Sequence, residues 1–538
     1  MTTDMKKIQA YIYTFVLSAM TMGIVSCDDF LDEMPDNRAE VDSEMKIQKL
    51  LVEAYPGHDY IQVNEMMSDN VDRFMADNPN TSRYIEQVYE WQDVTETNNE
   101  SSESFWGDCY SAIANANLAL EGIENIGGAT TTTLREAKAE ALLCRAYAHF
   151  LLANEFCMAY SGKTASQEMG LPYIETPETT LDPKHERGTL AEFYAKIDRD
   201  IQEALPIMGG SYYTIPKYHF NNLAAYAFAT RFYLYYEKWD KAVEYATMCL
   251  GSNPANVLRD YKTLANYTAY NEHTNHYVDA SLSCNLLMHT TYGNLGYVFG
   301  NYSTFKKYSH VAYIAENEDI GAKNIWGTGT SAFYARARVY TSNTSDYVIF
   351  WRFPREFEYT DLLKTRGYYR SIYPAFTTDE CLLNRAEAYI LLKDYDKAAA
   401  DMTMWMRNCV NTTKALTPES IVAFYNGKTV DYCYSDEDRL FSNLKKHLHP
   451  NFDIDAEGST QECMLQCLLA CRRVECMPMG IRWWDIKRYG IEIPRRTINA
   501  SGIPVSIEDW LSKDDPRRAI QIPLKVRTAG LAPNPRVK

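Results

Sequence analysis

Apolar residues recur at helical spacing along much of the chain. Residues 106–126 carry apolar side chains three and four positions apart and are followed by two glycines, and residues 134–160 continue the pattern with alanine, leucine and aromatic side chains. Residues 189–205 begin with Thr189, and Glu192 stands three positions later. This spacing is a capping box, in which each side chain accepts a hydrogen bond from the backbone N–H of the other residue. The pattern predicts helices over all three segments.

Two stretches of the chain repeat the same helical pattern. Residues 224–250 and 380–406 each place an alanine-rich amphipathic helix before a turn and a second helix, which begins at Trp239 or Tyr395 and continues Asp-Lys-Ala. An aromatic residue that fills the turn, an aspartate that caps the second helix and alanines that let the helices approach are typical of tetratricopeptide-like hairpins. Such units bury their apolar faces by stacking. Two unrelated helix pairs are the alternative. Residues 106–160 and 459–489 are candidates for further units.

Residues 261–373 differ from the rest of the chain. The helical period is lost there, and glycine, threonine, asparagine and aromatic residues become frequent. We expect loops, short strands and a few short helices in this insertion, and loops carried by a rigid scaffold are where binding function tends to lie. The predicted fold is therefore mainly α, with a tetratricopeptide-like helical scaffold over residues 46–260 and 374–490.

The N-terminus carries a signal for export. Two lysines precede an apolar run over residues 12–25, which is too short and too interrupted for a comfortable transmembrane span. The run ends in Ile-Val-Ser-Cys, which resembles a bacterial lipobox. We predict a signal peptide over residues 1–26, lipidation of Cys27 and a tether over residues 27–45. Several acyl chains give stable anchoring, at roughly 0.8 kcal/mol per methylene. An ordinary cleaved signal with an incidental Cys27 is the alternative.

Acidic residues follow the predicted anchor directly. Asp28 and Asp29 are joined by Asp32 and Glu33. This arrangement resembles the surface-export signal of some Gram-negative gut and oral bacteria, whereas in other Gram-negative bacteria an aspartate there retains a lipoprotein at the inner membrane. A solvated tether is a third interpretation. We expect the outer membrane and the cell exterior, and the leaflet stays open.

The charge of the chain limits its partners. The 538 residues carry a formal net charge of −17. A surface that acidic repels phosphate backbones and anionic lipid, which argues against nucleic-acid binding and leaves the lipid anchor as the membrane contact. Neutral ligands such as glycans or peptides suffer no such penalty.

Catalytic and metal-binding motifs are missing from the sequence. Most of the thirteen cysteines are interpreted as buried thiols, because their spacing shows no small-domain framework. Cys463, Cys467 and Cys471 are spaced by four on one predicted helical face, unlike the ligands of a zinc site. No P-loop, GxSxG, HExxH or paired dinucleotide glycines occur. We expect no catalytic residue, no metal and no cofactor, hence no enzyme. A lipid-anchored glycoside hydrolase is a less favoured alternative.

Several short motifs follow one another in a fixed order along the chain. They are Cys27-Asp28-Asp29-Phe30-Leu31-Asp32, Pro35-Asp36-Asn37-Arg38, Trp106 to Ala119, Arg145-Ala146-Tyr147-Ala148-His149-Phe150, Gly170-Leu171-Pro172-Tyr173, Arg187-Gly188-Thr189, Ala386-Glu387-Ala388-Tyr389 and Gly480 to Gly490. In this order, and behind a lipobox, they resemble the SusD/RagB family of outer-membrane nutrient-binding lipoproteins. One departure is Met479, where the family usually has an acidic residue, and the middle region matches no family motif.

The resemblance implies a fold, a location and a partner. The fold is a single SusD-like domain over residues 46–538, with about four tetratricopeptide-like helix pairs and a variable insertion. The partner is a SusC-type TonB-dependent outer-membrane transporter, to which such lipoproteins deliver glycans or, in the RagB branch, peptides. A glycan is the expected ligand. The alternatives are a peptide-binding RagB-like lipoprotein and a helical scaffold that binds only protein partners.

Aromatic residues of the insertion are the first candidates for ligand contact, because aromatic rings offer apolar faces to the C–H faces of sugars while amides supply polar contacts. A second patch precedes the first long helix, in a region that often flanks the ligand face in the resembling family. Core packing of these rings is the alternative, since the chain has 41 tyrosines. The candidates are Tyr292, Asn294, Tyr297, Tyr302, Trp326 and Tyr334 in the insertion and Asp69, Asn70 and Trp91 in the second patch.

Overall fold

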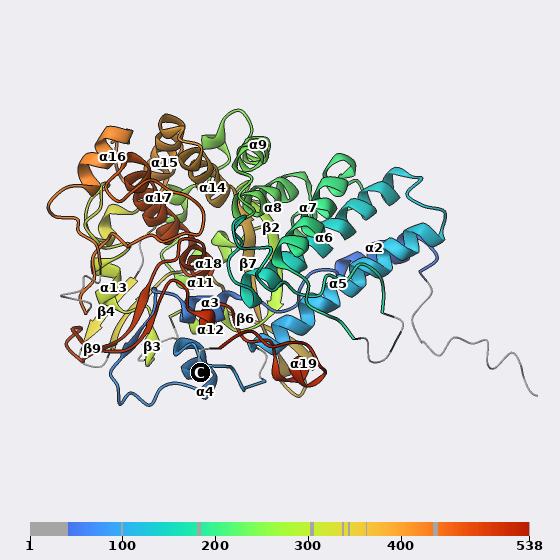
Figure 1. Cartoon of the computed structure of the whole chain (residues 1–538), viewed down its shortest axis with the longest axis horizontal. Coiled ribbons are helices and arrows are strands. Elements are labelled where there is room, and N and C mark those ends of the chain that lie inside the picture. Colours follow the sequence, from blue (N-terminus) through green and yellow to red (C-terminus); the bar gives the residue numbers. More distant parts are fainter. Residues whose placement is uncertain are drawn as a thin grey trace, which may run out of the picture. The chain divides into compact units, whose positions relative to one another are not determined.

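Paired helices make up most of the protein in the computed structural model (Figure 1). The structure describes residues 41–97, 100–178, 180, 184–301, 306–335, 338–342, 345–361, 363–433 and 440–536. Residues 43–538 form one compact unit. The predicted signal peptide, Cys27, most of the predicted tether and Tyr302 lie outside the described residues.

The scaffold is built from antiparallel helix pairs. Each pair packs its two helices together, and α14 also packs on α9 and α17. The predicted mainly α fold with tetratricopeptide-like pairs is confirmed. The paired helices are α5 (Ser102–Asn125) with α6 (Thr132–Phe156), α8 (Asn222–Tyr235) with α9 (Trp239–Leu250), α14 (Thr378–Leu391) with α15 (Tyr395–Cys409), and α16 (Pro418–Tyr425) with α17 (Thr460–Cys476).

Further helices pack against these pairs or connect them. In Figure 1, α2 (Glu44–Val52) lies along α5 and α6, and α18 (Ile481–Arg488) lies against α3 (Ile61–Met67). The capping box between Thr189 and Glu192 at the start of α7 is confirmed. The remaining helices are α4 (Arg83–Tyr89), α7 (Leu190–Ala204), α10 (Tyr261–Leu264), α11 (Tyr270–Tyr277), α12 (Leu295–Val298), α13 (Ala312–Asn317) and α19 (Leu524–Thr528), with short 3₁₀ turns at Leu205–Ile207, Pro216–Tyr218, Pro254–Asn256, Thr330–Ala332 and Pro516–Arg518.

The two predicted repeats share the same turn. Glu237 follows α8 and Lys393 follows α14, and both adopt a left-handed backbone, with φ of +58° and +63°. In both turns the next backbone N–H donates to the carbonyl oxygen five residues earlier, which closes the first helix of the pair. The two bonds run from Lys238 to Tyr233 and from Asp394 to Tyr389, both at 2.8 Å.

The aspartates of the repeat do not cap the second helices as expected. Lys238 and Asp394 occupy the N-cap positions, and neither side chain makes a capping hydrogen bond. Asp240 and Asp396 lie inside the first turn, where a negative charge is favoured by the positive end of the helix dipole.

Three small sheets complete the described structure. The first has the order β3 (Tyr308–Ser309), β1 (Asp72–Phe74), β8 (Ile493–Ile498) and β9 (Pro504–Leu511). The second has the order β2 (Asn285–Tyr292), β7 (Arg366–Thr377) and β6 (Glu356–Asp361), and all its neighbouring strands are antiparallel. The third pairs β4 (Arg338–Ser342) with β5 (Ser345–Ile349).

Strand β7 joins the second sheet to the helical scaffold. Its last residue, Thr377, is the N-cap of α14 and accepts a hydrogen bond from the backbone N–H of Glu380. The C-terminal half of β7 is buried, with Tyr373 and Phe376 in the core, whereas residues 366–369 are largely exposed. The sheet is therefore anchored at one end and open to solvent at the other.

The twelve cysteines after Cys27 are all buried and carry free thiols. This agrees with their interpretation as small core side chains. No described helix combines the length and the apolar character that crossing a bilayer requires.

Candidate ligand-binding surface

The exposed end of the β2–β7–β6 sheet gathers tyrosines at the surface. In the described part of the chain, the exposed tyrosines are Tyr297, Tyr359, Tyr368 and Tyr369, with exposed fractions of 41, 53, 50 and 38%. Three of them lie on the β6–β7 hairpin, and Tyr297 lies on α12, which packs against β7. Clustered exposed aromatic surface is typical of an interaction site, because single exposed rings are normally scattered.

Register divides these rings between two faces of the sheet. Phe357 pairs with Tyr369, and Glu358 pairs with Tyr368, so consecutive residues point to opposite sides. One face, here called the Tyr297 face, consists of Tyr297, Lys306, Arg355, Phe357, Tyr359 and Tyr369. The other, here called the Tyr292 face, consists of His58, Tyr292, Glu358, Tyr368 and Arg370.

Rings and cations alternate on the Tyr297 face. The Phe357 ring lies 4.9 Å from that of Tyr359 and 5.0 Å from that of Tyr369. Arg355 donates a hydrogen bond of 3.2 Å to the Tyr369 hydroxyl, and its guanidinium lies 5.7 Å from the Tyr369 ring and 6.0 Å from the Tyr297 ring. These contacts join the rings, which meet edge to face, into one continuous surface.

Two glycines let the backbone bring these side chains together. A Cβ on Gly296 would overlap the Pro354 carbonyl oxygen, so only glycine allows α12 to approach the segment that carries Arg355. A Cβ on Gly367 would overlap the Glu358 carbonyl oxygen across the hairpin. Both close approaches depend on the absence of a side chain.

On the Tyr292 face, the arginine is paired with a carboxylate. The Arg370 guanidinium lies 3.7 Å from the Tyr292 ring centroid and forms an ion pair of 2.6 Å with Glu358. The Tyr368 ring meets that of Tyr292 edge to face at 5.6 Å. On the other side of Tyr292 lies His58, whose Nδ1 is 2.6 Å from an Asp108 carboxylate oxygen.

Asn294 lies between the two faces, at the start of α12. Its carbonyl oxygen accepts hydrogen bonds from the backbone N–H groups of Tyr297 and Val298, at 2.8 and 2.9 Å. Its side-chain Oδ1 is buried and accepts no hydrogen bond within the described structure. The structure thus brings three predicted residues, Tyr292, Asn294 and Tyr297, to the same end of one sheet.

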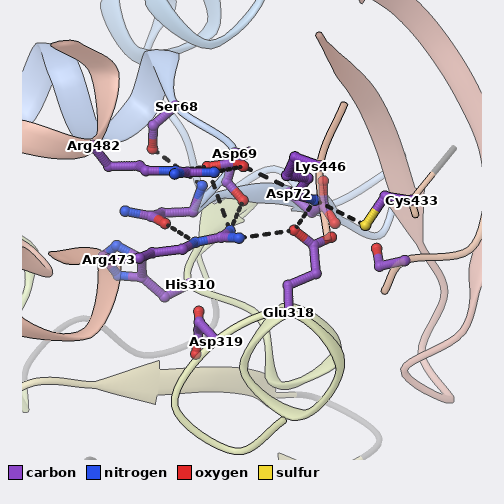
Figure 2. Close-up of polar contacts among 12 residues, drawn as sticks. Ser68, Asp69, Asp72, His310, Glu318, Asp319, Cys433, Lys446, Arg473 and Arg482 are labelled. Carbon is purple, nitrogen blue, oxygen red and sulfur yellow. Dashed lines mark hydrogen bonds and ion pairs between the residues drawn. The ribbon is translucent and has the colours of Figure 1, made fainter. Parts of the chain in front are cut away.

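Asp69 and Asn70 lie instead in a buried ionic network (Figure 2). Arg482 donates to both Asp69 carboxylate oxygens, at 2.9 and 2.7 Å. Arg473 donates to the Asn70 side-chain oxygen at 2.9 Å and to Glu318 at 3.1 Å. Figure 2 shows Asp69 held between the two arginines. Because protein groups engage both side chains, we leave Asp69 and Asn70 out of the proposed surface.

The electrostatics of this network indicate a structural role. Burial alone would raise the pKa of Asp69, but Arg473 and Arg482 outweigh it and hold that pKa well below its usual range. The pKa of Glu318 is also lowered. Lys446, 2.6 Å away, and two arginines outweigh the effect of burial on that pKa. The carboxylates therefore stay ionised and compensated inside the protein.

The other predicted residues lie elsewhere. Trp91 is buried, donates its indole N–H to the Met67 carbonyl at 3.0 Å and stacks on Arg495 at 3.7 Å. Trp326 is buried against Trp405, with ring centroids 5.7 Å apart. Tyr334 is half-buried, and its hydroxyl donates to Asn411 at 3.3 Å. None of these contacts joins them to the exposed sheet end, so we leave them out of the proposed surface as well.

None of the candidates chosen from the sequence lies on the β6–β7 hairpin, so Arg355, Phe357 and the three hairpin tyrosines were not predicted. The sequence does contain a pattern that predicts this hairpin. Glu-Phe-Glu-Tyr alternates polar and aromatic residues, and a short turn and Gly-Tyr-Tyr-Arg follow it. This pattern is typical of an exposed hairpin with aromatic cross-strand pairs.

A pocket offers a second candidate site. The described residues outline a cavity of about 540 Å³ lined by Trp106 and Tyr110 of α5 and by Val526 and Ala529 at α19. The size is typical of small-molecule sites. Among the described residues, no group of three or more histidine, cysteine or carboxylate side chains could hold a metal ion.

Comparisons with known proteins show what the chain resembles. Residues 29–234 match the SusD-like family described as starch-binding and associating with the outer membrane. No curated protein matches the chain significantly. A putative sugar-binding protein from Bacteroides vulgatus superposes with a TM-score of 0.64 at 17% identity, covering 92% of this chain and 99% of that chain.

Two further solved structures share the fold. A SusD superfamily protein from Bacteroides thetaiotaomicron has a TM-score of 0.59 at 20% identity, covering 92% of this chain and all of that chain. A SusD-like carbohydrate-binding protein from Bacteroides vulgatus has a TM-score of 0.59 at 16% identity, covering 91% of this chain and 96% of that chain. Residues 29–234 therefore resemble the SusD-like family, and the solved structures share the fold of this chain.

Proposed function

We propose that this protein binds glycans at the bacterial surface through the exposed end of the β2–β7–β6 sheet. The observation that carries the proposal is the concentration of exposed tyrosines on the β6–β7 hairpin and α12. Flat rings with polar edges suit sugars, which present apolar C–H faces and hydroxyl rims. The family description, starch-binding, and the names of two structural neighbours, sugar-binding and carbohydrate-binding, support the same ligand class.

The location and partner follow from the N-terminal motif and the family. Lipidation of Cys27 would anchor the chain to the outer membrane with residues 46–538 facing the cell exterior. The glycan would then pass to a SusC-type TonB-dependent transporter. The family's association with the outer membrane supports this arrangement.

In this proposal the protein binds the glycan without converting it. A peptide ligand, as in a RagB-like protein, and a protein-only scaffold stay as alternatives, and the same assays separate them.

Affinity electrophoresis against a polysaccharide panel tests the proposal. The double variant Tyr359→Ala/Tyr369→Ala should lose at least tenfold in affinity, because it removes two stacking surfaces without disturbing buried residues. Phe441→Ala is the matched control, since Phe441 is an equally exposed ring, at 48%, away from the hairpin. Ala529→Trp, which would fill the second pocket, should leave binding unchanged.

Four results would contradict the proposal. Shortened glycan products would show catalysis, and equal retardation of the double variant and the wild type would remove the hairpin from the site. Loss of binding in Ala529→Trp alone would transfer the site to the pocket beside α19. Binding of peptides but of no polysaccharide would favour the RagB-like alternative.

A further inference from the structure

The exposed end of the β6–β7 hairpin is open to solvent on both faces. Residues 358–360 of β6 and 368–369 of β7 are all exposed, although neighbouring residues of a strand point to opposite sides. Farther along β7, residues 371 and 373–376 are buried, again on both sides. An antiparallel sheet commonly packs one face on the core, so this end of the sheet is unusual in offering two surfaces to a ligand.

Two consecutive tyrosines carry one surface each. Tyr368 and Tyr369 are exposed by 50 and 38%, and alternation along the strand places Tyr368 on the Tyr292 face and Tyr369 on the Tyr297 face. On the Tyr297 face, Phe357 and Tyr359 extend the aromatic surface that begins at Tyr369. Because the two strands separate Tyr368 from Tyr369, the two rings cannot stack on the same stretch of a ligand.

Polar side chains surround Tyr368 on its own face. Strand register places Glu358 opposite Tyr368 and Glu356 opposite Arg370. Arg370 also pairs with Tyr292 across β2, so Tyr292, Arg370 and Glu356 form a row over three strands. The Glu358 side chain is 54% exposed. Carboxylates accept hydrogen bonds and a guanidinium donates them, so this face offers both functions to the hydroxyl groups of a sugar.

Contacts beside Tyr368 hold its ring in place. The half-buried Tyr292 ring lies in contact with Arg370 and His58, and it meets the Tyr368 ring edge to face at 5.6 Å. Asp108 holds His58 in turn, with a carboxylate oxygen 2.6 Å from Nδ1. Tyr368 is thus a supported ring with half of its surface exposed. A side chain that is ordered before binding loses less conformational entropy when a ligand stacks on it.

We propose that the hairpin binds two glycan chains at once, one on each face. Tyr369 and its neighbouring rings stack on the first chain, and Tyr368 stacks on the second. Arg370, Glu356 and Glu358 bind hydroxyl groups of the second chain. This inference rests on the proposed function and narrows its ligand to polysaccharides that present neighbouring chains, as branched or aggregated polymers do.

Two sites on one rigid element favour such polymers over short sugars. Once one face has bound a chain, the second site meets a neighbouring chain of the same polymer at a high effective concentration, and avidity of this kind gains roughly 10²–10⁴ over a single site. A short soluble oligosaccharide gains nothing, because each molecule occupies one face only. Loss of either face should therefore weaken binding of the polymer at least tenfold, while the affinity of the remaining face for an oligosaccharide stays within twofold.

Isothermal titration calorimetry with a hexasaccharide counts the sites. The probe is the hexasaccharide of the polymer that retards the wild type most in affinity electrophoresis, such as maltohexaose for starch or xylohexaose for xylan. The wild type should bind two molecules, whereas Tyr368→Ala and Tyr359→Ala/Tyr369→Ala should bind one each. Tyr368→Phe, which keeps the ring, and Phe441→Ala, away from the hairpin, should both bind two.

Linking of polymer chains gives an independent readout. A protein with two sites joins two chains, so dynamic light scattering should show the hydrodynamic radius of the soluble polymer growing with the wild type but not with Tyr368→Ala. One hexasaccharide per wild-type molecule, or two that persist in Tyr368→Ala, would overturn the inference and leave the proposed function standing. Retardation by no polymer of the panel would overturn both.

Discussion

Buried arginine–carboxylate pairs explain what several sequence motifs do. Arg145 donates to both carboxylate oxygens of Asp200, at 2.6 and 2.9 Å, and joins α6 to α7. Arg482 pairs with Asp69 in the same bidentate way, and Arg488 pairs with Glu387 of α14 at 2.6 Å. Several of the motif residues that resemble the SusD/RagB family are therefore residues that hold helices together. This is why they predict the fold well and the ligand poorly.

Removing one member of such a pair should be costly. Arg482→Ala leaves Asp69 buried without its bidentate partner, and we expect a loss of about 3–5 kcal/mol in the free energy of unfolding. Urea denaturation followed by circular dichroism measures the change. Arg366→Ala, at an exposed position, should stay within about 0.5 kcal/mol of the wild type. A similarly small effect for Arg482→Ala would mean that the network does not stabilise the fold.

A buried acid should make stability depend on pH. Burial raises the pKa of Asp319 to about 6, above its ordinary value of 3.8. Between pH 4 and 6 the unfolded chain releases this proton while the folded protein keeps it, so this residue lowers stability as pH rises, by up to about 3 kcal/mol.

Asp319→Asn should remove that contribution. Thermal unfolding from pH 4 to pH 7 should show the variant gaining on the wild type as pH increases, while the exposed Asp77→Asn follows the wild type throughout. A constant difference between Asp319→Asn and the wild type would contradict the assignment.

At the scale of elements, the helices were predicted and the hairpin was not. Helical period, the Thr189 capping box and the repeated turns define their elements through local interactions. The β6–β7 hairpin depends on cross-strand pairs and on two close backbone approaches, which a helical pattern does not reveal. Tyr292 and Tyr297 were selected because they lie in an aromatic-rich segment, and the same criterion selected Trp326, which is buried.

Gly367 tests whether the hairpin is the binding element. Gly367→Ala introduces a Cβ that overlaps the Glu358 carbonyl oxygen, so the strand pairing must shift. We expect glycan affinity to fall at least fivefold, with little change in the thermal midpoint, because this end of the sheet is exposed. Gly107→Ala is the control, since a Cβ there meets no atom within 4 Å. It should preserve binding and, as a helix substitution, stabilise by up to about 1 kcal/mol. Equal affinity in both variants would exclude the hairpin.

At the scale of the whole molecule, the order of motifs predicted the helical scaffold. The position of the proposed ligand surface could not follow from the motifs, because that surface lies where an exposed hairpin meets α12, two segments separated by about 60 residues of chain. Burial decides between a ring that packs and a ring that binds, and it is a property of the folded molecule rather than of any local pattern.

The anchor is a whole-molecule prediction of its own. Cys27→Ala should move the protein from the outer-membrane fraction to a soluble one, because the acyl chains have no other attachment point. Membrane fractionation with an immunoblot measures this, and metabolic labelling with palmitate should fail in the variant. Cys109→Ala, which alters a buried thiol, should keep the label. A Cys27→Ala protein that still sediments with membranes and carries label would refute lipidation at this residue.

The continuity of β7 with α14 has a mechanical consequence. No flexible linker separates them, because Thr377 ends the strand and caps the helix. A force applied to a polysaccharide bound at the hairpin would be transmitted along β7 to α14, which packs on α9 and α17. The binding surface would therefore move together with the helical scaffold as one rigid body.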